Sequence, residues 1–241
     1  MNKLNLNKSD KKLAVLIDPD KHDFDSLIDL LNQIENVHPD YILIGGSLVV
    51  NSSTEEAAKQ IRSYSSVPLV LFPGHFTQLT SQVDHILLLS LISGRNADLL
   101  IGQHVLAAPK LKELKDKISP TGYMLIDGGK PTSVSYISNT SPIPADKIDI
   151  GICTAIAGEA LGMNQIYLDA GSGAMNRIPA EMIQGVSKSI DIPVVVGGGI
   201  RKVSHIEACW DAGANLVVIG NGIEDGAEII APLVKFRSRN N

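Results

Sequence analysis

Eight short apolar runs recur along the chain, and most of the gaps between them carry helical spacing. The runs are rich in β-branched residues and end at Gly, Pro, Asp or Ser, which is typical of buried strands. They are Leu13–Asp18, Tyr41–Gly46, Leu69–Pro73, His85–Ser90, Gly122–Ile126, Ile166–Asp169, Val194–Gly197 and Leu216–Gly220. Their near-continuous hydrophobicity favours parallel strands that are covered on both faces.

The gaps hold apolar residues at helical spacings of three and four. The first such stripe runs from Phe24 to Ile34 behind the N-capping candidate Asp23. Similar stripes span Asn96–Leu111, Ile148–Leu161, Pro179–Ser189, Val203–Ala212 and Gly226–Phe236. This alternation predicts an α/β fold, a (β/α)8 TIM barrel, with a doubly wound open sheet as the alternative. A length of 241 residues suits such a barrel as one domain.

Two gaps depart from the alternation. Between Pro73 and His85 the chain is too short for a covering helix with two turns, so we expect the third helix to be replaced by a loop. That loss would leave a slot in the outer wall for an elongated apolar ligand. Lys130–Pro144 is the one long irregular stretch, and it follows the fifth strand. It is either a lid or a passive surface loop.

Composition excludes several classes of protein. A net charge of −5 without an Arg- or Lys-rich run disfavours nucleic-acid binding. Residues 1–12 are polar, so we interpret them as a flexible N-terminal tail rather than a secretion signal or anchor, and residues 13–241 as a single TIM-barrel domain. A cytoplasmic location follows. The two cysteines, Cys153 and Cys209, are expected to be reduced and buried.

Three of the last strand ends are rich in glycine. They are Tyr167-Leu168-Asp169-Ala170-Gly171-Ser172-Gly173, Gly197-Gly198-Gly199-Ile200 and Gly220-Asn221-Gly222. Glycine lets several main-chain N–H groups converge on an anion, because it has no side chain and tolerates positive φ. Since the loops that follow parallel barrel strands meet at one end, these segments predict a single phosphate cup.

Polar side chains at other strand ends are candidate metal-binding and catalytic groups for this cup. Asp18 ends the first strand and Ser47 closes the second, so their oxygens could share a Mg²⁺ ion that keeps most of its waters. Helix capping is the competing interpretation for both residues. Asp169 could act as a general base on a phosphorylated alcohol. Tyr167 lies on the same side of its strand and either binds the same ligand or packs in the barrel.

Five segments together carry a family resemblance. They are Leu16-Ile17-Asp18-Pro19-Asp20-Lys21, Ile44-Gly45-Gly46-Ser47, Tyr167 to Ala174, Val196 to Ile200 and Ile219-Gly220-Asn221. In this order, with a shortened third βα unit, the chain resembles the geranylgeranylglyceryl phosphate synthase family, including its PcrB-type bacterial members. The resemblance runs from the first strand to the eighth.

That resemblance implies a Mg²⁺-dependent prenyltransferase. It would join sn-glycerol 1-phosphate to a polyprenyl diphosphate, with geranylgeranyl diphosphate expected, forming an ether and releasing diphosphate. Asp18 and Ser47 would hold Mg²⁺, and Asp169 and Tyr167 would be catalytic. Glycerol phosphate would be bound by Tyr167, Leu168, Asp169, Ala170, Gly171, Ser172, Gly173, Gly198, Gly199, Gly220 and Asn221. A homo-oligomer and transient contact with a membrane surface are also implied.

The chain differs from the family pattern at two positions. Relatives commonly carry glutamate where Asp169 stands, so the side chain of the proposed base is one methylene shorter in this chain. They often carry an aromatic residue where Leu99 stands, so the preferred prenyl length could differ. Two other classes of protein remain open: a phosphate-binding isomerase or aldolase that acts on a phosphorylated metabolite, and a non-catalytic barrel that binds a phosphate ligand.

Overall fold

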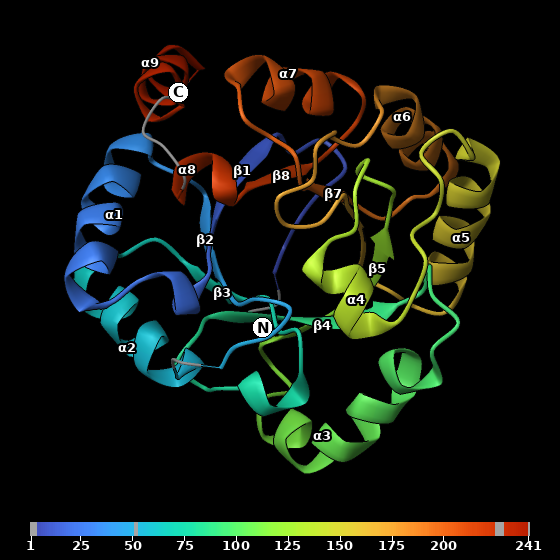
Figure 1. The fold of residues 1–241 in the computed structure, drawn as a ribbon, viewed down its shortest axis with the longest axis horizontal. Coiled ribbons are helices and arrows are strands. Elements are labelled where there is room, and N and C mark those ends of the chain that lie inside the picture. Colours follow the sequence, from blue (N-terminus) through green and yellow to red (C-terminus); the bar gives the residue numbers. More distant parts are fainter. Residues whose placement is uncertain (1–3, 51–52, 225–228, 241) are drawn as a thin grey trace.

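The computed structural model describes residues 4–50, 53–224 and 229–240. Within them, parallel strands close into a barrel in the order β1-β2-β3-β4-β5-β6-β7-β8, and helices surround it (Figure 1). The strands are β1 (Lys12–Ile17), β2 (Tyr41–Ile44), β3 (Leu69–Leu71), β4 (His85–Leu91), β5 (Ile118–Leu125), β6 (Gln165–Asp169), β7 (Val194–Gly197) and β8 (Leu216–Ile219). The predicted (β/α)8 barrel is confirmed, and the open-sheet alternative is wrong.

Helices follow most strands. They are α1 (Phe24–Val37), α2 (Thr54–Tyr64), α3 (Gln103–Glu113), α4 (Ser133–Ser138), α5 (Ile148–Ala160), α6 (Ala180–Ser189), α7 (Val203–Asp211), α8 (Asn221–Glu224) and α9 (Ile230–Asn240). Of these, α1, α3, α5, α6, α7 and α9 overlap the predicted stripes, whereas no stripe was predicted for α2, α4 and α8. A π-helical turn, η3 (Asp98–Gly102), leads into α3, and short 3-10 turns lie at η1 (Pro19–Lys21) and η2 (Phe76–Gln78). The last predicted stripe begins at Gly226, and its residues 226–228 lie outside the described residues.

The helix expected between β3 and β4 is replaced by a loop that holds only η2, as the sequence predicts. This shortening opens the barrel wall. Two residue pairs, Val70 with His85 and Leu71 with Ile86, join β3 to β4, whereas six pairs join β4 to β5. The outer half of β4 is instead held by α3, because the His104 Nε2 donates to the Leu89 carbonyl at 2.8 Å.

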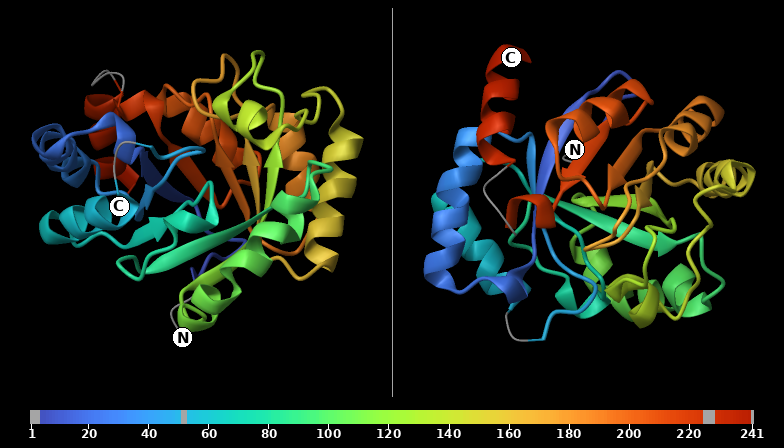
Figure 2. Two further views of the ribbon diagram at one scale, coloured as in Figure 1. Left: turned by 60° about the horizontal axis from the view of Figure 1, so that its bottom comes forward. Right: turned by 45° about the horizontal axis from the view of Figure 1, so that its top comes forward.

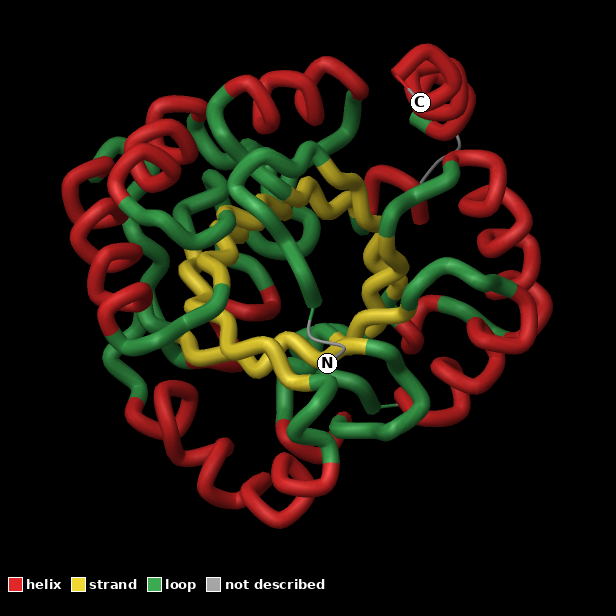
Figure 3. The backbone as a smooth tube through the Cα atoms, turned by 180° about the vertical axis from the view of Figure 1, so that it is seen from behind, coloured by secondary structure: helices red, strands yellow, loops and turns green. Residues whose placement is uncertain are grey.

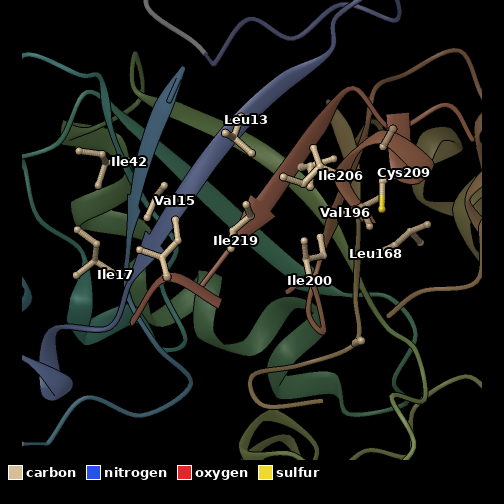
Figure 4. Close-up of a cluster of buried hydrophobic side chains, with 14 of the residues drawn as sticks. Leu13, Val15, Ile17, Ile42, Leu168, Val196, Ile200, Ile206, Cys209 and Ile219 are labelled. Atoms are coloured by element: carbon tan, nitrogen blue, oxygen red, sulfur yellow. The ribbon is translucent and has the colours of Figure 1, made fainter. Parts of the chain in front are cut away.

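The core has two layers, which follow from the alternation of side chains along each strand. One layer lies between the strands and the helices, where Leu13, Val15, Ile17, Val196 and Ile206 gather (Figure 4). The other layer fills the barrel interior and includes Tyr123, Tyr167 and Val195. Burial on both faces explains why the strands read as continuous apolar runs.

The first residues differ from the flexible tail that the sequence predicts. Leu4 and Leu6 are buried in the interior layer of the barrel. The Lys8 ammonium donates to the carbonyls of Ser187 and Ile190, at 2.7 and 3.1 Å. Figure 3 shows this segment crossing the end of the barrel that is seen from behind. The reason is hydrophobic: two leucines among polar residues fill the open end of the barrel.

The stretch 130–144 is not wholly irregular, because it contains α4. A capping box starts this helix, in which the Thr132 side chain and the Ser135 hydroxyl each bond the other's backbone N–H. α4 and the loops after β6 and β7 rise above the same end of the barrel (Figure 2, left). Whether α4 moves as a lid stays a prediction.

The cysteines differ in environment. Cys209 is buried as predicted, but the prediction for Cys153 is wrong, because this residue is exposed on α5. α5 is apolar around much of its circumference, so its sequence pattern alone does not reveal which face meets the barrel.

Candidate active site

A cavity of about 620 Å³ opens at the end of the barrel where the strands finish, and the loops after β1, β2, β6, β7 and β8 all contribute to it. Among the predicted site residues, the cavity is lined by Asp18, Ser47, Tyr167, Asp169, Gly171, Ser172, Gly173, Gly198, Gly199, Gly220 and Asn221. We call this space the cup. The structure therefore brings together residues that lie up to two hundred positions apart in the sequence.

Two predicted residues do not line the cup. Leu168 and Ala170 are buried in the layer between strands and helices, and Figure 4 shows Leu168 among that cluster. The Ala170 N–H also donates to the Gly197 carbonyl at 3.1 Å. Neither side chain can therefore contact a ligand in the cup. The alternation of the β6 strand accounts for Leu168, since its neighbours Tyr167 and Asp169 point the opposite way.

Close backbone packing at Gly198 shapes the cup. Gly198 has a φ of +82°, and a Cβ placed there would lie 2.7 Å from Ala170 N and 2.8 Å from both Gly171 N and the Asp169 Oδ1. A side chain would therefore collide with the segment that carries Asp169. Farther round the rim, the Ser172 hydroxyl donates to Asn221 Oδ1 at 2.7 Å and joins the loops after β6 and β8.

Asp169 lies at the end of β6 and is only 8% exposed. The Tyr123 hydroxyl donates to its Oδ2 at 2.6 Å, and the Gly171 N–H donates to its Oδ1 at 2.9 Å. Burial raises the pKa of the Asp169 carboxyl above its usual range, and these two hydrogen bonds partly oppose the rise. A carboxylate that lines the cup and has a raised pKa is suited to accept a proton from a ligand bound there.

Three aromatic rings form the floor of the cup beside this carboxylate. Tyr167 stacks on Phe72 with ring centroids 5.1 Å apart, and Tyr123 packs against both rings at 5.7 and 5.9 Å. The Tyr167 hydroxyl lies over Gly197, where a Cβ would approach it to 2.5 Å. Tyr167 therefore packs in the barrel and also lines the cup, and its binding of a ligand stays a prediction.

Asp18 and Ser47 face the cup from β1 and β2. The Asp20 N–H donates to Asp18 Oδ1 at 3.1 Å, so Asp18 does cap the η1 turn. A Cβ on Gly46 would lie 3.3 Å from the same oxygen, which keeps the backbone beside the carboxylate. Lys21 lines the cup as well.

This oxygen set fits a hard divalent cation. A carboxylate and a hydroxyl are ligands that Mg²⁺ prefers, and this ion keeps several waters and binds substrate phosphates besides. Among the described residues no group of three or more His, Cys, Asp or Glu is arranged to hold a metal. Any metal here would therefore complete its ligands with water and with substrate oxygens.

A second cavity of about 360 Å³ continues from the cup and lies along the loop after β3, the later part of β4, and α3. We call it the groove. Ser47, Leu48, Phe72, Tyr123, Val134 and Ile137 border both spaces. Beyond them the groove is lined mostly by apolar side chains: Phe76, Leu79, Leu88, Leu89, Leu91, Leu99 and Ala107. The slot predicted from the missing helix is therefore present and apolar.

Sequence reasoning missed two residues at the junction of the cup and the groove. Tyr123 lies inside β5 and Phe72 directly after β3. Strand alternation places Tyr123 and Leu125 on the same face of β5, but only the barrel itself shows that this face points inward. Arg201 also lines the cup, and its guanidinium donates to the Ala174 carbonyl at 2.7 Å, which fixes the loop after β6.

In the parts of the chain that the structure describes, no helix is both long enough and apolar enough to cross a membrane.

The comparisons with known proteins agree over the whole barrel. A model of the PcrB family matches residues 7–235. The geranylgeranylglyceryl phosphate synthase of Spirosoma linguale is 50% identical over 223 residues, which are 92% of this chain and 90% of that protein.

More distant relatives have the same printed name. The geranylgeranylglyceryl phosphate synthase of Korarchaeum cryptofilum is 34% identical over 225 residues, covering 93% of this chain and 92% of that protein. A solved structure of (S)-3-O-geranylgeranylglyceryl phosphate synthase from Thermoplasma acidophilum, in complex with the substrate sn-glycerol-1-phosphate, aligns with a TM-score of 0.87. Its identity is 28%, over 95% of this chain and 93% of that one.

Proposed function

Because this chain belongs to the PcrB family, we propose that it is a prenyltransferase that joins sn-glycerol 1-phosphate to a polyprenyl diphosphate. The product is an ether-linked prenylglyceryl phosphate, and diphosphate is released. The relatives named as geranylgeranylglyceryl phosphate synthases support this assignment, as does the solved relative with bound sn-glycerol-1-phosphate.

One observation carries the proposal: a polar cup and an apolar groove meet at a buried carboxylate. A phosphorylated alcohol and a prenyl diphosphate need those two environments, and their reacting ends must meet between them. Tyr123 borders both cavities and donates to Asp169. A sugar-phosphate enzyme or a phosphate-binding barrel would use the cup and leave the apolar groove without a role.

The reaction exchanges one carbon–oxygen bond for another. The free hydroxyl oxygen of glycerol phosphate attacks C1 of the prenyl chain, and the bond from C1 to the diphosphate oxygen breaks. Asp169 takes the proton that the hydroxyl loses. The faces of Phe72, Tyr123 and Tyr167 are suited to the positive charge that develops on the allylic carbon, because aromatic faces attract cations.

We propose Mg²⁺ as the cofactor, with Asp18 and Ser47 as its protein ligands. When bound, the metal would neutralise the charge that builds on the departing diphosphate. Asp18 is suited to this role because its carboxylate faces the cup while its turn is fixed by Asp20. Lys21 supplies an ammonium at the same rim of the cup.

Affinity for the prenyl chain should come from the groove. Each buried CH₂ contributes about 0.8 kcal/mol before the costs of association. We expect geranylgeranyl diphosphate to be used, and we expect Leu99, which lines the groove, to influence the longest chain that fits.

The test measures formation of the ether product, its dependence on Mg²⁺ and its dependence on Asp18. Purified protein is incubated with radiolabelled geranylgeranyl diphosphate and sn-glycerol 1-phosphate, and the ether product is extracted and counted, with Mg²⁺ or with a chelator. Asp18→Asn should lose most activity, whereas the matched change Asp25→Asn on the exposed start of α1 should not. Equal activity of Asp18→Asn and the wild type, in Mg²⁺ and in chelator, would remove the metal proposal.

A homo-oligomer is supported by a second observation. Large exposed apolar side chains gather on two successive parts of the outer wall: Ile101, Val105 and Leu106 on η3 and α3, and Ile150, Ile156 and Leu161 on and beside α5. We propose that these exposed apolar side chains on α3 and α5 pack against a second copy of the chain. Light scattering should show Val105→Glu and Ile156→Glu as monomers, with Tyr64→Glu on α2 unchanged. A monomeric wild type would contradict this assembly.

A further inference from the structure

The hydrogen bond between Tyr123 and Asp169 connects two strands inside the barrel. In the β5–β6 register, Tyr123 is paired with Tyr167, and Leu125 is paired with Asp169. The Tyr123 side chain therefore starts one pleat below Asp169 and reaches up to Oδ2 at 2.6 Å. Such a short contact is typical of a hydroxyl that donates to an ionised carboxylate.

The tyrosine cannot turn away from this bond easily. It is 5% exposed, and its ring packs against both Phe72 and Tyr167. Burial, followed by the charge of Asp169, raises the pKa of the Tyr123 hydroxyl well above its usual range. This shift favours the protonated hydroxyl, which donates a hydrogen bond to the Asp169 Oδ2.

Asp169 depends on this donor. Burial raises the pKa of its carboxyl, and the hydrogen bond from Tyr123 lowers that pKa more than the hydrogen bond from the Gly171 N–H does. Besides Tyr123, the titratable groups that line the cup with it are Tyr167 on the same strand and Asp18, Lys21, Tyr136 and Arg201 from other segments. β7 contributes only glycine backbone here, at Gly197 and Gly198.

We propose that Tyr123 is a positioning residue for Asp169: its hydroxyl holds Oδ2 against the barrel wall, favours the ionised carboxylate and leaves the remaining lone pairs turned to the cup. This inference rests on the proposed function, in which Asp169 receives the proton of the acceptor hydroxyl. The sequence prediction named Tyr167 as a catalytic and ligand-binding residue and did not name Tyr123.

The length of the aspartate side chain fits this arrangement. A glutamate at the same backbone position would carry its carboxylate about one bond length, roughly 1.5 Å, farther from its strand. At that place the oxygen would move away from the hydroxyl of Tyr123. The two residues should therefore be coupled, and changing one should alter the effect of changing the other.

The experiment removes the hydroxyl and keeps the ring, with Tyr123→Phe. A hydrogen bond to a charged group corresponds to an upward shift of about one to two pH units in the midpoint of Asp169. The acid limb of the kcat/KM profile should move up by that amount, with about tenfold lower activity on the limb for each unit. The fall should be mostly in kcat. Tyr41→Phe is the matched control, because Tyr41 is also buried and its hydroxyl accepts a hydrogen bond from Lys12, at the start of β1 and away from the cup.

A second readout does not depend on turnover. In protein labelled with ¹³C at aspartate carboxyls, the Asp169 resonance is the one lost in Asp169→Asn, and its titration midpoint should rise in Tyr123→Phe but not in Tyr41→Phe. Thermal unfolding identifies variants that fail to fold. In an Asp169→Glu background, the same Tyr123→Phe change should have a smaller effect on kcat.

The results separate two possible failures. An unshifted carboxyl titration in folded Tyr123→Phe, or a shifted titration with an unshifted activity limb, would overturn the positioning role. A wild type that makes no ether product at any pH would overturn the proposed function instead. In that case the carboxyl titration still decides whether Tyr123 controls Asp169.

Discussion

Gly198→Ala should show how tightly the cup is built around Asp169. The φ of +82° disfavours any residue with a Cβ by about 1–2 kcal/mol. The added methyl would also lie 2.7–2.8 Å from Ala170 N, Gly171 N and the Asp169 Oδ1, and overpacking of this kind costs about 1–3 kcal/mol. The total is roughly 2–5 kcal/mol. For a chain of this length that lowers the midpoint of thermal unfolding by about 4–20 °C.

Two other glycines of the cup provide matched controls. Gly173 has a φ of +71° but only Lys130 Nζ nearby, at 3.7 Å, so Gly173→Ala should show the backbone strain without the collision. At Gly220 no positive φ applies, and a Cβ would make ordinary contacts with Leu16 at 3.7–3.8 Å. Gly220→Ala should therefore be neutral or slightly stabilising, since alanine restricts the unfolded chain.

The assay is thermal unfolding followed by the fluorescence of the single tryptophan, Trp210, together with calorimetric titration of sn-glycerol 1-phosphate. The predicted order of destabilisation is Gly198→Ala, then Gly173→Ala, then Gly220→Ala. Gly198→Ala should also lower activity more than the other two, because its methyl displaces the carboxylate. If all three variants unfold at the same temperature, or if Gly220→Ala is the least stable, the close approach at Gly198 does not exist in solution.

Three further predictions concern single ionisable groups. Asp169→Asn should lose activity yet be more stable than the wild type at neutral pH. The pKa of Asp169 in the folded chain is raised above its ordinary 3.8, so the ionised carboxylate lowers the free energy of unfolding as pH rises from 3.8 through that raised pKa. A difference in melting temperature that persists unchanged below pH 3.8 would contradict this. Wild-type activity should fall as pH drops through the raised pKa of Asp169, and a pH–rate profile with its acid midpoint at or below 3.8 would argue against this residue as the base. Burial raises the pKa of the Cys209 thiol to about 11, so maleimide should not modify it at pH 8 until the chain unfolds; peptide mapping that finds Cys209 labelled in native protein would oppose this.

The barrel was predictable because its strands are buried on both faces. A run such as Leu69–Leu71 has little polar character, and the Gly, Pro or Asp residues beside each run mark where the strands end. The absence of a helix between β3 and β4 was predictable from the short stretch of chain between these two strands. The N-terminal segment was not, because Leu4 and Leu6 have no periodic neighbours and their burial depends on the open end of the barrel.

The site was predictable where polar residues or glycines end strands. Asp18, Ser47, Asp169 and Gly198 all line one cup, as their places in the sequence predict. Strand alternation could have excluded Leu168, and the barrel register was needed to find Tyr123. The partner of Asp169 comes from β5, 46 residues earlier, and no local pattern indicates that contact. Exposure of Cys153 was equally hidden, because α5 is apolar on more than one face.

The most direct measurement is product formation by the purified chain with geranylgeranyl diphosphate, comparing sn-glycerol 1-phosphate with its sn-glycerol 3-phosphate enantiomer in the presence and absence of Mg²⁺. We predict an ether product that requires the metal, is selective for sn-glycerol 1-phosphate and is lost in Asp169→Asn. No ether product with geranylgeranyl or longer diphosphates, from folded protein that still binds glycerol phosphate, would contradict the account and favour a phosphate-binding barrel of another function.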